Sequence, residues 1–202
     1  MLLSPAVSLA TQPRCFGCRR TGAWACSTCL ASLRSPLATE RIPCVDQVLA
    51  AWAYDGVARD LILALKLRGK RPAAEPLATA MTRAIQNEGS GVTAITWVPG
   101  RAAEMRRRGF DHAEVIARAV GASLGLPVIG MLDRTGHRPD QTALSGSARR
   151  RNLKGAFTAS KVAGQVMVID DLVTTGATAE ACARALRSRG ATYVAVAAPC
   201  RV

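Results

Sequence analysis

The sequence is poor in aromatic residues, in acidic residues and in long apolar runs, and each shortage argues against a class of protein. Aromatic residues make up 4% of the 202 positions, so base-stacking platforms for single strands are not evident. No run approaches the roughly 18 apolar residues of a membrane helix, and we expect no membrane insertion. Only 14 acidic residues accompany 27 basic ones, and the formal net charge is +13. Polyanions are the expected partners, although a merely solvated basic surface gives the same charge.

Residues 1–14 lack the basic segment that precedes the apolar core of a signal peptide, and we therefore expect a cytoplasmic protein. The chain nevertheless contains seven cysteines. In a reducing compartment this number indicates metal binding rather than disulfides. The length suffices for one α/β domain and a small additional module, but not for two full domains.

Four of the cysteines form two CxxC pairs that are separated by seven residues, namely Cys15 with Cys18 and Cys26 with Cys29. Each pair can direct two thiolates at one metal ion. Together they predict a closed, tetrahedral, structural Zn²⁺ site. Two disulfides or a redox pair are the alternative. Cys44 follows alone, and a packed thiol without a metal is the favoured interpretation of it.

Downstream of this array, apolar β-branched runs alternate with amphipathic segments. Strands are predicted at residues 48–54, 93–98, 128–132, 166–169 and 193–198, and helices at 57–69, 73–87, 179–189 and directly after Asp111. This alternation predicts an α/β fold with a mostly parallel sheet flanked by helices. We therefore divide the chain into a zinc-ribbon-like module with its linker, residues 1–44, and an α/β domain, residues 45–202.

The chemistry concentrates in the run Val166-Met-Val-Ile-Asp-Asp-Leu-Val-Thr-Thr-Gly-Ala-Thr178. Its apolar start predicts a strand buried on both faces, so the two acids lie at the strand's carboxyl end, where open α/β sheets bind ligands. The N–H groups and hydroxyls that follow can surround a phosphate, while carboxylates suit ribose hydroxyls. Two acids that merely cap a helix are the alternative. The predicted ligand contacts are Asp170, Asp171, Thr174, Thr175, Gly176, Ala177 and Thr178, of which the two acids are also the catalytic candidates.

Three basic segments lie elsewhere in the sequence. Residues 101–112 are predicted to form a loop with four arginines, after which Asp111 and Glu114 have capping-box-like spacing for a helix. Residues 133–155 are long, polar and arginine-rich, which is typical of a lid over a ligand or of a disordered loop. The cluster at residues 66–71 is interpreted as a solvated loop.

The run from Val166 to Thr178 resembles, at every position, the 5-phosphoribosyl-1-diphosphate (PRPP) signature of type I phosphoribosyltransferases. The chain as a whole is similar to the ComF family, phosphoribosyltransferase-like proteins associated with natural competence. Besides the four cysteines, the similarity is carried by Leu65-Lys66-Leu67-Arg68-Gly69, Val98-Pro99, Arg107-Arg108-Gly109-Phe110 and the series Arg134, Gln141, Leu144, Arg150 and Asn152. It implies a type I phosphoribosyltransferase fold behind a zinc ribbon, with Mg²⁺ accompanying PRPP.

The resemblance also assigns roles to the basic segments. The region after Pro99 corresponds to the pyrophosphate loop and the series from Arg134 to Asn152 to the flexible loop. The candidate residues there are Arg101, Arg107, Arg108, Arg134, Gln141 and Arg150. The chain departs from the family at Asp111-His112, where Asn-Gln is usual, and this adds a negative charge near the pyrophosphate loop. His112 and His137 are otherwise interpreted as solvated histidines.

Two functions follow from these expectations. One is transfer of phosphoribose from Mg²⁺-PRPP to an unidentified acceptor. The other is a non-catalytic competence factor that retains the anion site and binds single-stranded DNA or a DNA-uptake protein through residues 101–108 and 149–154. A PRPP or nucleotide sensor without turnover is a third interpretation of the same residues, and a homo-oligomer is compatible with each.

Overall fold

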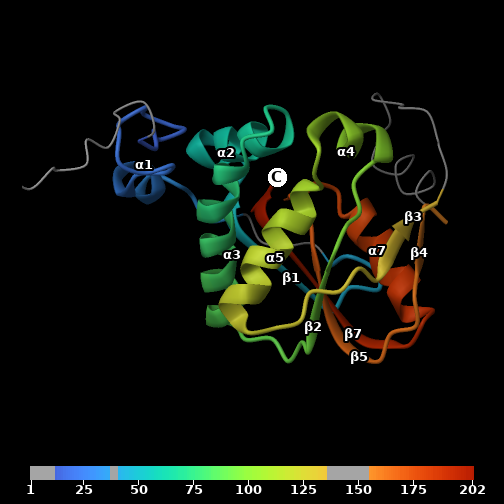
Figure 1. The fold of residues 1–202 in the computed structure, drawn as a ribbon. Coiled ribbons are helices and arrows are strands. Elements are labelled where there is room, and N and C mark those ends of the chain that lie inside the picture. Colours follow the sequence, from blue (N-terminus) through green and yellow to red (C-terminus); the bar gives the residue numbers. More distant parts are fainter. Residues whose placement is uncertain (1–11, 37–40, 136–154) are drawn as a thin grey trace, which may run out of the picture.

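A sheet of parallel strands organises the computed structural model, which describes residues 12–36, 41–135 and 155–202 (Figure 1). Its strands are β1 (Gln47–Ala53), β2 (Ala94–Trp97), β5 (Gly164–Ile169) and β7 (Ala191–Arg201), in the order β1-β7-β5-β2, and the short β6 (Leu172–Val173) pairs with the end of β7. Every pairing among these strands is parallel. The predicted α/β architecture with a mostly parallel sheet is thus confirmed.

Helices cover both faces of this sheet because successive residues of each strand point to opposite sides. On β5, Met167 and Ile169 join the core that includes α2 (Gly56–Lys66), α3 (Ala74–Glu88) and α5 (His112–Leu124). Val166 and Val168 face the opposite core, which α7 (Ala177–Arg187) covers. Figure 1 shows α3 and α5 together, with α7 apart from them. Among the residues described, no helix combines the length and apolar character that a bilayer crossing requires.

The predicted strand at residues 128–132 is wrong as a strand of the main sheet. Val128 forms a single parallel bridge with Ile95 of β2. The N–H of Met131 then donates to the Thr96 hydroxyl, 3.2 Å away, instead of to a main-chain carbonyl, and the ladder ends. The chain continues into β3 (Leu132–Arg134), which pairs antiparallel with β4 (Phe157–Ala159) in a separate two-stranded sheet.

The predicted loop at residues 101–112 is also wrong, because it contains the helix α4 (Ala102–Arg108). Alanine, glutamate, methionine and arginine all favour helices. Gly109 ends the helix in the left-handed region, at φ 75°, which a residue without a Cβ adopts readily. Three of the four arginines of this segment therefore lie on a helix, and Arg101 directly precedes it.

The amino-terminal module, with the short α1 (Ser27–Ala31), packs beside α2 (Figure 1). Phe16 and Leu33 extend the core of the α2 face, and Gly17 lies close enough to Val57 that a Cβ there would be 3.0 Å from it. The following segment reaches the other face of the sheet, where Ile42 joins the core under α7. The module and its linker are thus packed against both sides of the α/β domain. A 3₁₀ turn, η2 (Arg71–Ala73), connects α2 to α3.

Candidate functional site

The acidic pair lies at the carboxyl edge of the sheet, as the sequence predicts. Asp170 and Asp171 follow the last residue of β5, and the loop Pro99-Gly100 follows the neighbouring strand β2. Both carboxylates are buried, with residue exposures of 9% and 5%. Parallel strands bring their carboxyl ends to one edge, so the acids lie where the loops of this fold converge.

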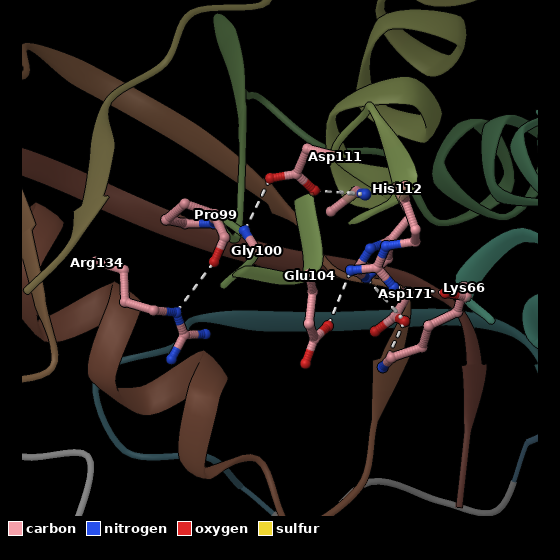
Figure 2. A network of polar contacts seen from close by, with 10 residues as sticks. Lys66, Pro99, Gly100, Glu104, Asp111, His112, Arg134 and Asp171 are labelled. Carbon is pink, nitrogen blue, oxygen red and sulfur yellow. Dashed lines mark hydrogen bonds and ion pairs between the residues drawn. The ribbon is translucent and has the colours of Figure 1, made fainter. Parts of the chain in front are cut away.

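Asp171 contacts two basic side chains from other elements (Figure 2). Its Oδ2 lies 2.7 Å from Lys66 Nζ, at the end of α2, and 3.0 Å from His112 Nε2, at the start of α5. Neither contact has the alignment of a hydrogen bond. Burial opposes the ionisation of Asp171, but His112 and Lys66 outweigh it and hold the pKa of this carboxyl below its usual range. Asp171 is therefore an anion at neutral pH.

Asp170 has the opposite electrostatic character. Burial, followed by the charge of Asp171, raises the pKa of Asp170 to about 7. Its Oδ1 accepts a hydrogen bond of 2.8 Å from the backbone N–H of Asp171. The two neighbouring carboxyls thus have pKa values moved in opposite directions, and at neutral pH one stays charged while the other can carry a proton.

Asp111, one of the two positions where the chain departs from the ComF pattern, forms hydrogen bonds that support the local structure. It caps α5, and its Oδ1 accepts from the N–H of Ala113 at 3.0 Å. Its Oδ2 accepts from the N–H of Gly100 at 2.8 Å (Figure 2). The predicted cap is confirmed, but Glu114 pairs with Arg118 instead of completing a capping box. The extra carboxylate therefore ties the loop after β2 to the start of α5.

The arginines of α4 lie in contrasting environments. The side chain of Arg108 is 3% exposed; it donates to the main-chain carbonyl of Lys66 and, at 2.9 Å, to Glu104. Arg101 precedes the helix as its N-cap residue and is exposed. Arg107 is also exposed. Arg108 thus fixes the relative position of α2 and α4, while the other two are exposed.

Arg134 approaches the same loop from β3. Its Nε donates to the carbonyl of Pro99 at 3.2 Å (Figure 2). Its guanidinium lies 4.6 Å from the centre of the Phe157 ring. Burial lowers the pKa of Arg134, but an arginine remains charged at neutral pH. The sequence candidates Gln141 and Arg150 lie outside the described residues, as does His137.

The predicted phosphate turn connects β6 to α7. Gly176 is the N-cap residue of α7 at φ 72°, and a Cβ at this position would lie 2.6 Å from Ile42 Cδ1. Thr174 and Thr175 are exposed. The N–H groups of residues 177–178 have no main-chain acceptor among the described residues, as is usual in a first helical turn. The turn therefore offers unpaired donors to an anion.

The four cysteines of the amino-terminal module converge as predicted. The sulfur atoms of Cys15, Cys18, Cys26 and Cys29 all lie within 4.8 Å of one another. A tetrahedral site with Zn–S bonds of about 2.3 Å separates its sulfurs by about 3.8 Å, so the four thiols could bind a metal such as zinc. Burial of the Cys15 thiol is outweighed by backbone N–H groups, that of Cys26 foremost, and its pKa is lowered to about 6. Cys44 does not belong to this cluster.

Curated proteins with known names match part of the chain. Competence protein F of Haemophilus influenzae is 30% identical over 96 residues, which are 45% of this chain and 42% of that protein. The chain is similar to competence protein F over this part of its length. DNA utilization protein YhgH of Escherichia coli O157:H7 is 39% identical over 98 residues, 47% of this chain and 43% of that protein. These relatives confirm the resemblance to the ComF family, although the match spans less than half the length of each.

Other comparisons add little. No protein-family model matches the chain. Among solved structures, that of TT1426 from Thermus thermophilus covers 63% of this chain and 74% of that chain, with 16% identity and a TM-score of 0.39. A likeness at this level does not establish a shared fold.

Two residues of the site were interpreted as solvated from the sequence; this is wrong for His112, whereas Lys66 is partly exposed and also contacts Asp171. His112 is buried in the first turn of α5, and Lys66 reaches into the site from the basic cluster at residues 66–71. One available signal was the position of Lys66 within the run Leu65–Gly69, which carries part of the ComF resemblance. For His112, the signal was its position directly after Asp111, the predicted N-cap. The first turn of a helix that packs on the sheet lies close to the edge of that sheet.

Proposed function

We propose that this chain binds PRPP, or a related sugar phosphate with an anionic leaving group, at the carboxyl edge of the sheet. The observation that carries the proposal is the buried pair Asp170 and Asp171, followed after the short β6 by a left-handed glycine and the open first turn of α7. Carboxylates accept hydrogen bonds from ribose hydroxyls, and the turn at residues 174–178 donates to the 5-phosphate. We include in the proposal the type I phosphoribosyltransferase fold for residues 45–202.

The surrounding residues fit a transfer of the phosphoribosyl group. In such a reaction diphosphate leaves the ribose C1, and fixed cations that face the leaving group stabilise the charge that develops on it. Arg134, which donates to the carbonyl of Pro99 in the loop after β2, and the exposed Arg101 and Arg107 are the candidates for this task. Asp170 and Asp171 hold the ribose in position. Mg²⁺ would arrive with the diphosphate and neutralise part of its charge.

Calorimetric titration of the metal-loaded protein with Mg²⁺-PRPP tests the binding. The wild-type chain should bind PRPP, and Asp171→Asn should weaken binding by tenfold or more, because a hydrogen bond to a charged acceptor is worth about 1.5–3 kcal/mol. Asp133→Asn is the matched control, since it removes one exposed carboxylate from the neighbouring β3. Absence of binding by the wild type, or equal binding by both variants, would sink the proposal. A screen for pyrophosphate release over bases and amines then identifies an acceptor.

A second candidate function is a DNA-linked role in competence, without turnover. It is favoured by the names of the relatives and by the exposed arginines Arg106 and Arg107 on α4, in a chain with net charge +13. Single-stranded DNA would contact such residues through phosphates, so its affinity should fall steeply with salt, by about 0.7 in the logarithmic slope for each phosphate contacted.

Replacement of both exposed α4 arginines by alanine tests this role. It should reduce the salt slope for single-stranded DNA by about 1.4, which corresponds to two phosphate contacts. Arg83→Ala, an exposed arginine on α3, is the matched control. An affinity that does not change between low and physiological salt would exclude phosphate contacts as the basis of DNA binding.

A further inference from the structure

We infer that Lys66 is a ligand-binding residue of this site, and that its ammonium contacts the diphosphate end of the ligand rather than the 5-phosphate. The inference rests on the proposed function and deepens it. It starts from a contact that no motif of the sequence predicts, the ion pair between Lys66 Nζ and Asp171 Oδ2 at 2.7 Å.

The Lys66 side chain links solvent to the buried carboxylate. Its relative exposure is 37%, whereas that of the Asp171 side chain is 7%. An ammonium group carries three N–H donors, and the contact with Asp171 occupies one direction only. The remaining donors are therefore on a partly exposed group at the mouth of the site, where a ligand that reaches Asp171 would meet them.

Lys66 is the last residue of α2, and its main chain contacts α4. Its carbonyl accepts from buried Arg108, and the same guanidinium binds Glu104 of α4 at 2.9 Å (Figure 2). Helix α4 follows directly on the loop after β2 that contains Pro99 and Gly100. The donors for the 5-phosphate come from the start of α7, a separate element. A ligand that spans the site would thus place its diphosphate, and not its 5-phosphate, beside Lys66.

The charges explain why such a residue is needed. Asp171 is an anion in a buried position, and it would repel an anionic ligand at short range. Lys66 offsets this repulsion and remains able to turn toward the incoming diphosphate. Asp171 would keep a polar partner in that event, because His112 Nε2 lies 3.0 Å from the same oxygen. A purely structural ion pair would satisfy Asp171 but would not discriminate between ligands.

Binding of three probes separates these roles: Mg²⁺-PRPP, inorganic pyrophosphate and ribose 5-phosphate. Lys66→Met should weaken PRPP and pyrophosphate by about tenfold or more and leave ribose 5-phosphate within about twofold, since only the first two carry the group that Lys66 contacts. Lys66→Arg, which keeps the charge, should retain PRPP within about threefold of wild type. Lys70→Met removes an exposed lysine of the same connecting segment and should change none of the three. Thermal unfolding of each variant checks that the fold is retained.

Three outcomes would overturn the inference: unchanged PRPP and pyrophosphate binding in Lys66→Met, an equal loss for all three probes, or no rescue by Lys66→Arg in a folded protein. Failure of the proposed function gives a different result, because the wild type then binds no PRPP. In that case the measurement of pyrophosphate binding still tests whether Lys66 contacts a diphosphate. Loss of wild-type pyrophosphate binding in Lys66→Met supports the inference, and a wild type that binds no pyrophosphate contradicts it.

Discussion

Replacement of Asp170 by asparagine is expected to stabilise the fold above pH 7 while it impairs ligand binding. Burial, together with the charge of Asp171, raises the pKa of Asp170 to about 7, against an ordinary value of 3.8. Between these two values the folded protein keeps a proton that the unfolded chain has released. The stability of the wild type therefore falls as the pH rises through this window, and the full loss is present above pH 7.

The size of this effect follows from the shift. One pKa unit corresponds to about 1.4 kcal/mol, so the change from 3.8 to about 7 costs the wild type on the order of 4 kcal/mol of unfolding free energy above pH 7. Asparagine has nearly the same shape, and its amide oxygen can still accept from the N–H of Asp171. Asp170→Asn removes the ionisation and should gain about 1.4 kcal/mol per pH unit over the wild type until the difference levels off.

Denaturant unfolding of both proteins at about pH 5, 6, 7 and 8, with free zinc held constant, measures this difference. Asp171→Asn is the control, and it should change the stability in the opposite direction. It leaves Lys66 and His112 beside a neutral amide and should destabilise the protein, because a buried charge pair loses one partner. A difference between Asp170→Asn and wild type that does not vary with pH would refute the reasoning.

Two further changes test the metal site and the phosphate turn. Cys15→Ser with Cys18→Ser should lower bound zinc from about one equivalent to less than half, whereas Cys44→Ser should not; metal analysis of the purified proteins distinguishes these outcomes. Gly176→Ala should cost about 2–4 kcal/mol in denaturant unfolding, because it adds a Cβ at positive φ and 2.6 Å from Ile42. That cost should shrink by at least about 1 kcal/mol in an Ile42→Ala background, and an undiminished cost would show that Ile42 is not the obstacle.

The sheet and the metal cluster were predictable because their signals are local in sequence. Residues 166–169 form a short apolar run that only a strand buried on both faces explains, and β5 has this environment. The two CxxC pairs bring their sulfurs together through tight turns. Helix α4 was missed for a physical reason: none of its apolar residues is buried, so it has no apolar stripe, and its arginines gave it the composition of a loop.

The candidate site was only partly predictable because it combines one continuous motif with single residues from other elements. Asp170 and Asp171 follow from the motif. The contacts of Asp171 depend on where α2 ends and α5 begins against the strand, and no periodicity contains that information. Lys66 comes directly after Leu65, a fully buried core residue, so its side chain emerges at the rim of the core. A basic residue in that position faces the site, although the basic residues around it make it look solvated.

The segment between the cysteine module and the sheet belongs to the scaffold of the phosphate turn. Ile42 lies against Gly176, while Arg187 of α7 donates to the carbonyl of Cys44 at 2.9 Å and pairs with Asp46. These contacts fix α7 at both of its ends, and α7 presents the unpaired N–H groups of the turn. Loss of a metal from the cysteine cluster can therefore reach the turn through this segment in two ways, by releasing Ile42 or by releasing the contacts of Arg187. The loss of PRPP affinity in Ile42→Ala measures the first of these, so a larger loss on metal removal would require the contacts of Arg187 or the contact of the module with α2.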